Sequence, residues 1–161
     1  MQVNKKQAAT TGIYVGELVV PRPREQVFEF FADARNLEAI TPPWLQFSIL
    51  TPCPVSMGVG ALIDYKLRIH GVPVKWQTEI TAWDPPHRFV DEQRRGPYRR
   101  WVHEHRFEVC AQGTLMIDNV RYVVPGGRLV DWLFVRRDVT RIFAYRSERL
   151  RELFGCQPPV T

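Results

Sequence analysis

The chain has 161 residues, of which 45% are hydrophobic and 24% are charged. This length corresponds to one ordinary domain and excludes a second domain of full size, and the composition excludes a disordered or fibrous protein. No apolar run approaches the roughly 18 to 20 residues that a membrane-spanning helix needs. Residues 1–11 are polar, lack the apolar block of a secretory signal and are expected to be disordered, so we expect a cytoplasmic protein.

The net charge is +5, from 22 Lys and Arg against 17 Asp and Glu. Such an excess suits nucleic acid, an anionic ligand, an anionic membrane surface or simply solubility. No helix-turn-helix, zinc-finger or RNP-like motif accompanies it, so nucleic acid is an unfavoured partner. Cys53, Cys110 and Cys156 are odd in number and widely spaced, which indicates reduced thiols rather than a disulfide framework.

The first elements are predicted from apolar spacing and from prolines. Residues 12–20 are rich in apolar and β-branched side chains and predict a strand. In residues 24–34 the apolar positions recur every three or four residues, which predicts a helix. Asn36 is placed to cap a second short helix over 37–40, which the prolines from Pro42 onward end.

A series of strands follows, with turn residues between them. A type II′ turn at Gly71–Val72 would join the third and fourth strands of the chain. This register sets Tyr65 opposite Thr78 and Leu67 opposite Trp76, with all four on one face. The predicted strands after the short helices are 46–51, 60–70, 73–83, 88–95, 99–110 and 114–124.

Beyond Gly127 the apolar period changes from two to about 3.6, which predicts a helix of about 26 residues that ends at Gly155, with a tail over 156–161. This order of elements predicts an α+β fold in which a seven-stranded antiparallel sheet is covered on its concave face by the last helix. The helix stripe expected to face the sheet comprises Leu129, Leu133, Arg136 or Arg137, Val139, Ile142, Phe143, Arg146, Leu150 and Leu153.

The pattern over residues 12–154 resembles the START-like superfamily, also called SRPBCC or polyketide cyclase and lipid transport. The resemblance is carried by Asn36-Leu37, Thr41-Pro42-Pro43-Trp44, the stretch 89–107, Thr114, Asp118, Tyr122 and Pro125. It implies a helix-grip fold and a START-like ligand-binding domain over 12–155, with a cavity between sheet and helix. Different members bind lipids, hormones or polyketide-like molecules, and some catalyse cyclisation or dehydration, so the fold does not choose among these functions.

The strand over 99–110 alternates sharply. A three-residue turn over 96–98, which the family-like stretch favours, places Asp91 opposite His103, Gln93 opposite Trp101, and Phe89 opposite His105. A two-residue turn would substitute Val90 and Glu92. The face that we expect to be concave carries Trp101, His103, His105, Phe107 and Val109.

A carboxylate opposite an imidazole in an apolar chamber can be catalytic or structural. Asp91 would fix the tautomer of His103 and raise its pKa, which equips the imidazole for proton transfer. Alternatively, each group satisfies the other or gives one hydrogen bond to a ligand. His103 and His105 with Asp91 or Asp118 also form a possible metal pattern, but a catalytic zinc needs three converging protein ligands. We predict no metal and, without a phosphate loop or dinucleotide fingerprint, no cofactor.

Three hypotheses follow, and the oligomeric state stays open. The first is a protein that binds a small hydrophobic or amphipathic molecule through Tyr65, Leu67, Trp76, Gln93, Trp101, His103, His105, Asp118, Tyr122 and Phe143. The second is a cyclase or dehydratase that uses His103 and Asp91 as general acid and base. The third is contact with an anionic head group or membrane surface through a basic cavity mouth, although these arginines can also be solvated turn residues: Arg94, Arg95, Arg99, Arg100 and Arg128.

Overall fold

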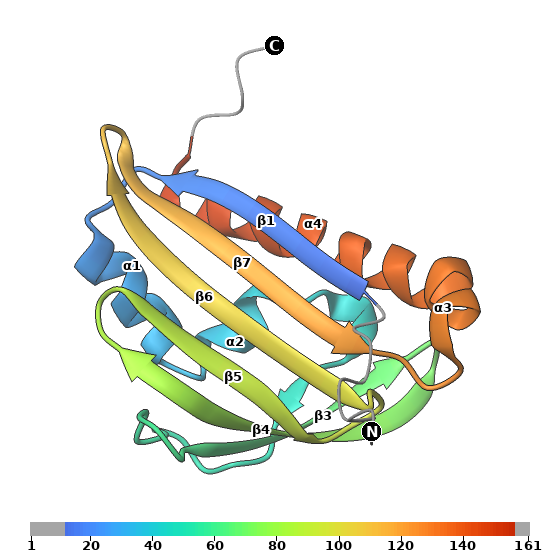
Figure 1. Ribbon diagram of the computed structural model, residues 1–161. Helices are drawn as coiled ribbons and strands as arrows, with labels where there is room; N and C mark the ends of the chain where they lie inside the picture. Colours follow the sequence, from blue (N-terminus) through green and yellow to red (C-terminus); the bar gives the residue numbers. More distant parts are fainter. Residues whose placement is uncertain (1–11, 157–161) are drawn as a thin grey trace, which may run out of the picture.

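The computed structural model describes residues 12–156, which form one curved sheet and the helices that it holds (Figure 1). Residues 1–11, for which disorder is expected, and the tail beyond residue 156 lie outside the described residues. The elements in chain order are β1 (Gly12–Val20), α1 (Arg24–Ala32), α2 (Asn36–Ile40), η1 (Pro43–Leu45), β2 (Ser48–Ile49), β3 (Leu62–Ile69), β4 (Val72–Asp84), β5 (Arg88–Arg95), β6 (Arg100–Cys110), β7 (Gly113–Val123), α3 (Gly127–Val130), η2 (Asp131–Val135) and α4 (Arg136–Phe154).

The sheet is antiparallel throughout, in the order β1-β7-β6-β5-β4-β3-β2. It bends around α4, and the short helices α1 and α2 lie at the opposite end of the concave side from α3 (Figure 1). The predicted seven-stranded helix-grip architecture is therefore confirmed. Within the described part of the chain, no helix is both long and apolar enough to cross a bilayer.

The β3–β4 hairpin differs from its predicted register. Its turn is centred on His70 and Gly71, whose φ angles of 50° and 80° correspond to a type I′ turn rather than type II′. Tyr65 consequently pairs with Trp76, so the predicted register is wrong by two positions. The alternation of a strand has period two, and the shift therefore leaves every side chain on its predicted face. The missed signal is His70, a non-glycine residue in the left-handed region.

The β5–β6 hairpin has the predicted register. Asp91 lies opposite His103, and Phe89 lies opposite His105. The concave face of β6 carries buried His103, His105 and Phe107, as expected. Val109, predicted for the same face, is exposed near the end of the strand.

The second short helix does not have the predicted cap. Arg35 occupies the N-cap position of α2 and Asn36 is its first residue. The side chain of Asn36 instead donates from Nδ2 to the carbonyl oxygen of Phe30, at 2.8 Å. Asn36 therefore joins α2 to α1, since its amide is used as a donor across the bend rather than as an acceptor for the helix start.

The C-terminal helical region is continuous but changes its winding. The α-helical turn of α3 passes into the π-helical turn η2 and then into α4, which ends at Gly155 as predicted. A π turn holds an extra residue and therefore rotates the side chains that precede it relative to a regular helix. Leu129 and Leu133, predicted to face the sheet, are exposed for this reason, and Leu153 is exposed in the last turn.

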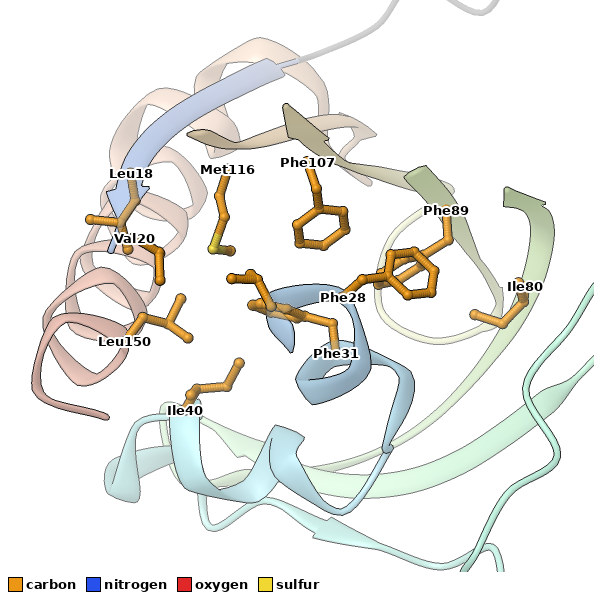
Figure 2. Packing of buried hydrophobic residues seen from close by; sticks show 11 residues of the cluster. Leu18, Val20, Phe28, Phe31, Ile40, Ile80, Phe89, Phe107, Met116 and Leu150 are labelled. Atoms are coloured by element: carbon orange, nitrogen blue, oxygen red, sulfur yellow. The ribbon is translucent and has the colours of Figure 1, made fainter. Parts of the chain in front are cut away.

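A hydrophobic core fills one end of the space between sheet and helices. Figure 2 shows Phe28 and Phe31 from α1 directed toward Phe107 of β6, with Leu150 of α4 at the side. The rings of Phe28 and Phe31 each lie 5.5 Å from that of Phe107, within the range of favourable aromatic contacts. This packing closes one end of the fold and leaves the other end for the site.

Candidate ligand cavity

A cavity of about 470 Å³ lies between the concave face of the sheet and α4. This volume is within the range of small-molecule sites, and the walls are mainly aromatic and aliphatic, as such sites usually are. Phe31, Ile80 and Phe89 separate it from the hydrophobic core. The lining includes most of the residues that the sequence indicated, namely Tyr65, Leu67, Trp76, Asp91, Trp101, His103, His105 and Phe143.

Three predicted ligand contacts are placed elsewhere. Gln93 donates from Nε2 to the Tyr98 carbonyl at 2.7 Å and accepts from the Tyr98 amide at 3.2 Å, so it holds the β5–β6 turn instead of lining the cavity. Tyr122 is 2% exposed, beneath the ring of Trp101. Asp118, on β7, contacts His103 and His105 of β6 and does not itself line the cavity. These three residues shape or support the wall but do not form it.

The polar end of the cavity is a network of two histidines and two aspartates. His103 Nε2 donates to Asp118 Oδ1 at 2.8 Å, and His105 Nε2 donates to Asp91 Oδ2 at 2.9 Å. The predicted approach of Asp91 to His103 is present at 3.7 Å, between Oδ2 and Nδ1, but the hydrogen bond that fixes the His103 ring comes from Asp118 instead. Backbone positions can be directly opposite while long side chains lean along the strands to a diagonal neighbour.

Arg146 of α4 completes this network. The residue is 9% exposed, and Nη2 lies 3.8 Å from Asp118 Oδ1 and 3.5 Å from His105 Nδ1. The guanidinium also lies over Phe31, 5.2 Å from the ring centre. The buried Nε has no hydrogen-bond partner among residues 12–156. Sequence reasoning placed Arg146 on the buried stripe but did not assign it to the site, although an arginine at a core position already indicates a buried partner.

The carboxylates remain ionised in this buried setting. Burial raises the pKa of Asp118, but Arg146 and the two imidazoles outweigh it and hold that pKa well below its usual range. Burial also raises the pKa of Asp91, and the hydrogen bond from His105 with the nearby positive charges brings it below its ordinary value. Two buried negative charges therefore lie beside Arg146 and the imidazoles, since a charge that is removed from water must be paired.

The two histidines are shifted in opposite directions. Burial and the neighbouring His105 together lower the pKa of His103 despite the two carboxylates. Burial also lowers the pKa of His105, but hydrogen bonds to Asp118 and Asp91 outweigh burial and raise it. His105 has a carboxylate oxygen within 3.1 Å of each ring nitrogen, which suits the doubly protonated imidazolium. The predicted rise in the pKa of His103 is wrong, and the rise belongs to His105.

The donor set also bears on metal binding. The ligand atoms of Asp91, His103 and His105 lie within 4.8 Å of one another, and nitrogen and carboxylate donors of this kind can hold a transition metal. The same atoms already form matched hydrogen bonds, and the positive charge of Arg146 lies beside them. The arrangement therefore fits a self-satisfied charge network better than a cation site.

The exposed lining residues define the mouth of the cavity. The guanidinium of Arg141 on α4 lies 4.2 Å from the ring centre of Trp44, and His70 Nε2 lies 2.6 Å from Asp138 Oδ2. The mouth thus lies between η1, the β3–β4 turn and α4, and Arg141 is a basic rim residue that sequence reasoning missed. Arg94 pairs instead with Glu79, and the predicted mouth residues that do not line the cavity are Arg94, Arg95, Arg99, Arg100 and Arg128.

A curved antiparallel sheet that holds a long C-terminal helix over an internal cavity defines a helix-grip protein of the START type. The chain belongs to the family described as polyketide cyclase / dehydrase and lipid transport, whose sequence profile matches residues 20–141. No curated protein sequence matches the chain significantly.

Solved structures share the fold at low sequence identity. Protein Ms6760 from Mycobacterium smegmatis is 17% identical, with a TM-score of 0.67 over 90% of this chain and 92% of that one. Protein CV1439 from Chromobacterium violaceum is 12% identical, with a TM-score of 0.70 over 90% and 99%. The major latex-like protein 151 of Panax ginseng is 14% identical, with a TM-score of 0.66 over 93% and 100%. At these identities the similarity concerns the fold alone.

Proposed function

We propose that this protein encloses a small hydrophobic or amphipathic molecule between its sheet and α4. The observation that carries this proposal is the cavity of about 470 Å³, in which aromatic and aliphatic walls meet one buried polar network. Sites for small molecules commonly combine these two features, because apolar walls provide affinity and a few fixed polar groups provide orientation. Membership of a family whose description includes lipid transport supports the same class of ligand.

The arrangement of the walls indicates how such a molecule lies. Trp76 and Trp101 stand edge to face, 5.5 Å apart, and offer flat apolar surfaces to the body of the ligand. His103, His105 and Arg146 are buried at the polar network, where the N–H groups of both imidazoles are already bonded to carboxylates. The guanidinium of Arg146 is therefore the group that offers N–H donors to an oxygen at the end of the ligand. The ligand would then point its polar end inward and its apolar body toward Trp44 at the mouth.

A larger side chain in the cavity should weaken this binding. We expect Ile142→Trp to weaken the affinity for an anilinonaphthalene sulfonate dye, measured by fluorescence titration, by about tenfold or more. Forcing extra side-chain volume into a packed space costs about 1–3 kcal/mol, and the dye would have to share the cavity with the new indole ring. Val109→Trp, at a residue that is 69% exposed and outside the lining, should bind the dye like the unmodified protein. Native mass spectrometry of both variants would show whether a co-purified molecule is lost with Ile142→Trp alone. Equal dye binding by both variants would contradict the proposal.

A proton-transfer enzyme is the second candidate, and one observation favours it. His103 lines the cavity, its pKa is lowered, and its Nε2 is held by Asp118, so the neutral imidazole presents a basic Nδ1 in a fixed orientation. In this assignment Asp118 orients the base, and Asp91 acts through His105. A cyclisation or dehydration would use such a base to remove a proton beside a carbonyl group.

His103→Asn separates the two candidates. If His103 is the base, the variant should retain ligand but lose turnover by on the order of 10² to 10⁴. The co-purified molecule would then differ between the unmodified protein and the variant, by one water for a dehydration or in chromatographic retention for a cyclisation. An identical molecule in both preparations would support binding without catalysis.

A further inference from the structure

A group of large apolar side chains is exposed on the first two turns of the C-terminal helical region. Trp132 is 66% exposed and Phe134 is 58% exposed, and Leu129 and Leu133 lie beside them in the chain with similar exposure. We call these four residues the α3–η2 patch. Single exposed apolar residues are ordinary, but four within six positions of one helical segment, including a tryptophan, form a surface that needs a partner.

The patch cannot turn inward without unfolding the segment. Val130 and Val135 pack on the core cluster that includes Tyr122, and Asp131 between them is buried. These residues occupy the side of α3 and η2 that faces the sheet. The π turn thus fixes the segment with its valines inward, and the α3–η2 patch is held outward by the fold.

The exposed charges between Gly127 and Arg137 are all positive, and Asp138, the next acidic residue, is paired with His70. Arg128, Arg136 and Arg137 are exposed, and none of them forms a salt bridge with another residue between 12 and 156. The only acidic residue from Gly127 to Arg137 is Asp131, which is buried. The surface is therefore an apolar strip bordered by unpaired guanidinium groups.

The patch also lies close to the cavity mouth. Asp138, which bonds to His70 across the mouth, follows Phe134 by one helical turn, and Arg141 follows by a further turn. In Figure 1, α3 lies at the end of the molecule where the helical region begins, away from α1. A surface that contacts the patch would therefore face the rim of the cavity.

We propose that the α3–η2 patch docks on an anionic lipid bilayer. Tryptophan, leucine and phenylalanine on one side of a short helix, with arginines beside them, are the side chains that insert at a bilayer surface and contact lipid phosphates. A second copy of the chain that met this patch with its own patch is a poorer partner, because the protein carries a net charge of +5 and each patch would bring three exposed arginines. Docking at this point would bring Trp44 and Arg141 next to the lipid without requiring that the cavity be filled.

Co-sedimentation with vesicles tests the proposal. The unmodified protein should bind vesicles of phosphatidylcholine containing phosphatidylserine, bind phosphatidylcholine alone weakly, and dissociate as salt is raised. Neutralising the three patch arginines should weaken binding on the order of 100-fold, since each basic residue near an anionic surface contributes about 1 kcal/mol, or about fivefold. This first variant is Arg128→Gln combined with Arg136→Gln and Arg137→Gln. A second variant, Trp132→Ser combined with Phe134→Ser, removes the apolar anchors.

A matched control carries the same loss of charge on the opposite face of the sheet. Lys66, Lys75 and Arg121 are exposed there, at positions that alternate with inward side chains. Their replacement by glutamine should leave vesicle binding unchanged. Equal loss in this control, or equal binding to both kinds of vesicle, would overturn the proposal. So would a patch-dependent dimer in sedimentation velocity without vesicle binding, because the patch would then be an interface between copies.

Discussion

Arg146→Met is expected to lower the free energy of unfolding by about 3–5 kcal/mol at neutral pH, because it leaves two buried carboxylates with only the His105 imidazolium to balance them. Asp118 Oδ1 lies 3.8 Å from the guanidinium, and neither residue has free access to water. Methionine fills much of the arginine stem between Phe31 and Phe143, so loss of packing contributes little. Urea unfolding measures the difference, with exposed Arg137→Met on the same helix as the control, which should change the free energy of unfolding by less than about 0.5 kcal/mol.

The pH dependence of this loss distinguishes charge from packing. In the unmodified protein Asp118 has a depressed pKa, so its stabilising contribution is present above the ordinary carboxyl pKa and is lost as pH falls through the folded value. In Arg146→Met, burial acts on Asp118 with less opposition, and the folded variant takes up a proton more readily. The gap between the two proteins should therefore narrow as pH falls from 7 toward about 4. A gap that is constant with pH would mean that Arg146 acts through packing.

The sequence predicts the fold well because its strongest signals are periodic. Alternation in β6 and the Asp91–His103 register follow from residues that must share one face, and the structure confirms both. The β3–β4 register is wrong because His70 adopts a left-handed conformation that the sequence pattern alone does not indicate. A slip of two residues preserves the faces, so the error does not change which side chains form the cavity.

The site is predicted less well, since it depends on contacts between distant elements. Asp91 and His103 are opposite in the sheet, yet the pKa values of both histidines also depend on hydrogen bonds to Asp118 from β7. Arg146 from α4 in turn lies beside Asp118 and lowers its pKa. Helical periodicity places Arg146 toward the sheet but does not give its partner. The sequence also did not predict the exposed α3–η2 patch. A regular helix would place Leu129 and Leu133 toward the sheet, whereas the π turn places them in solvent.

Asp118→Asn is expected to lower the free energy of unfolding by about 3–5 kcal/mol at neutral pH, because Arg146 and His105 lose a shared buried counter-charge. Asp64→Asn, where the carboxylate accepts a hydrogen bond from neutral Gln77 at 3.1 Å, should cost less than about 1.5 kcal/mol. NMR titration should also show a fall in the pKa of His105, since the hydrogen bond to Asp118 is a main cause of its rise. A pKa of His105 unchanged in the variant would contradict this account of the network.

The sign of the pH effect follows from His105. A histidine with a raised folded pKa stabilises the protein below the unfolded value of about 6.5, and this contribution is lost as pH rises through the folded pKa. Asp118→Asn shrinks that contribution, so the difference from the unmodified protein should be larger near pH 6 than near pH 8. Combining Asp118→Asn with Arg146→Met removes one charge of each sign from the same buried network, and the double variant should therefore lose less than the two single losses together. Simple additivity would mean that Arg146 and Asp118 do not interact across the 3.8 Å that separates them.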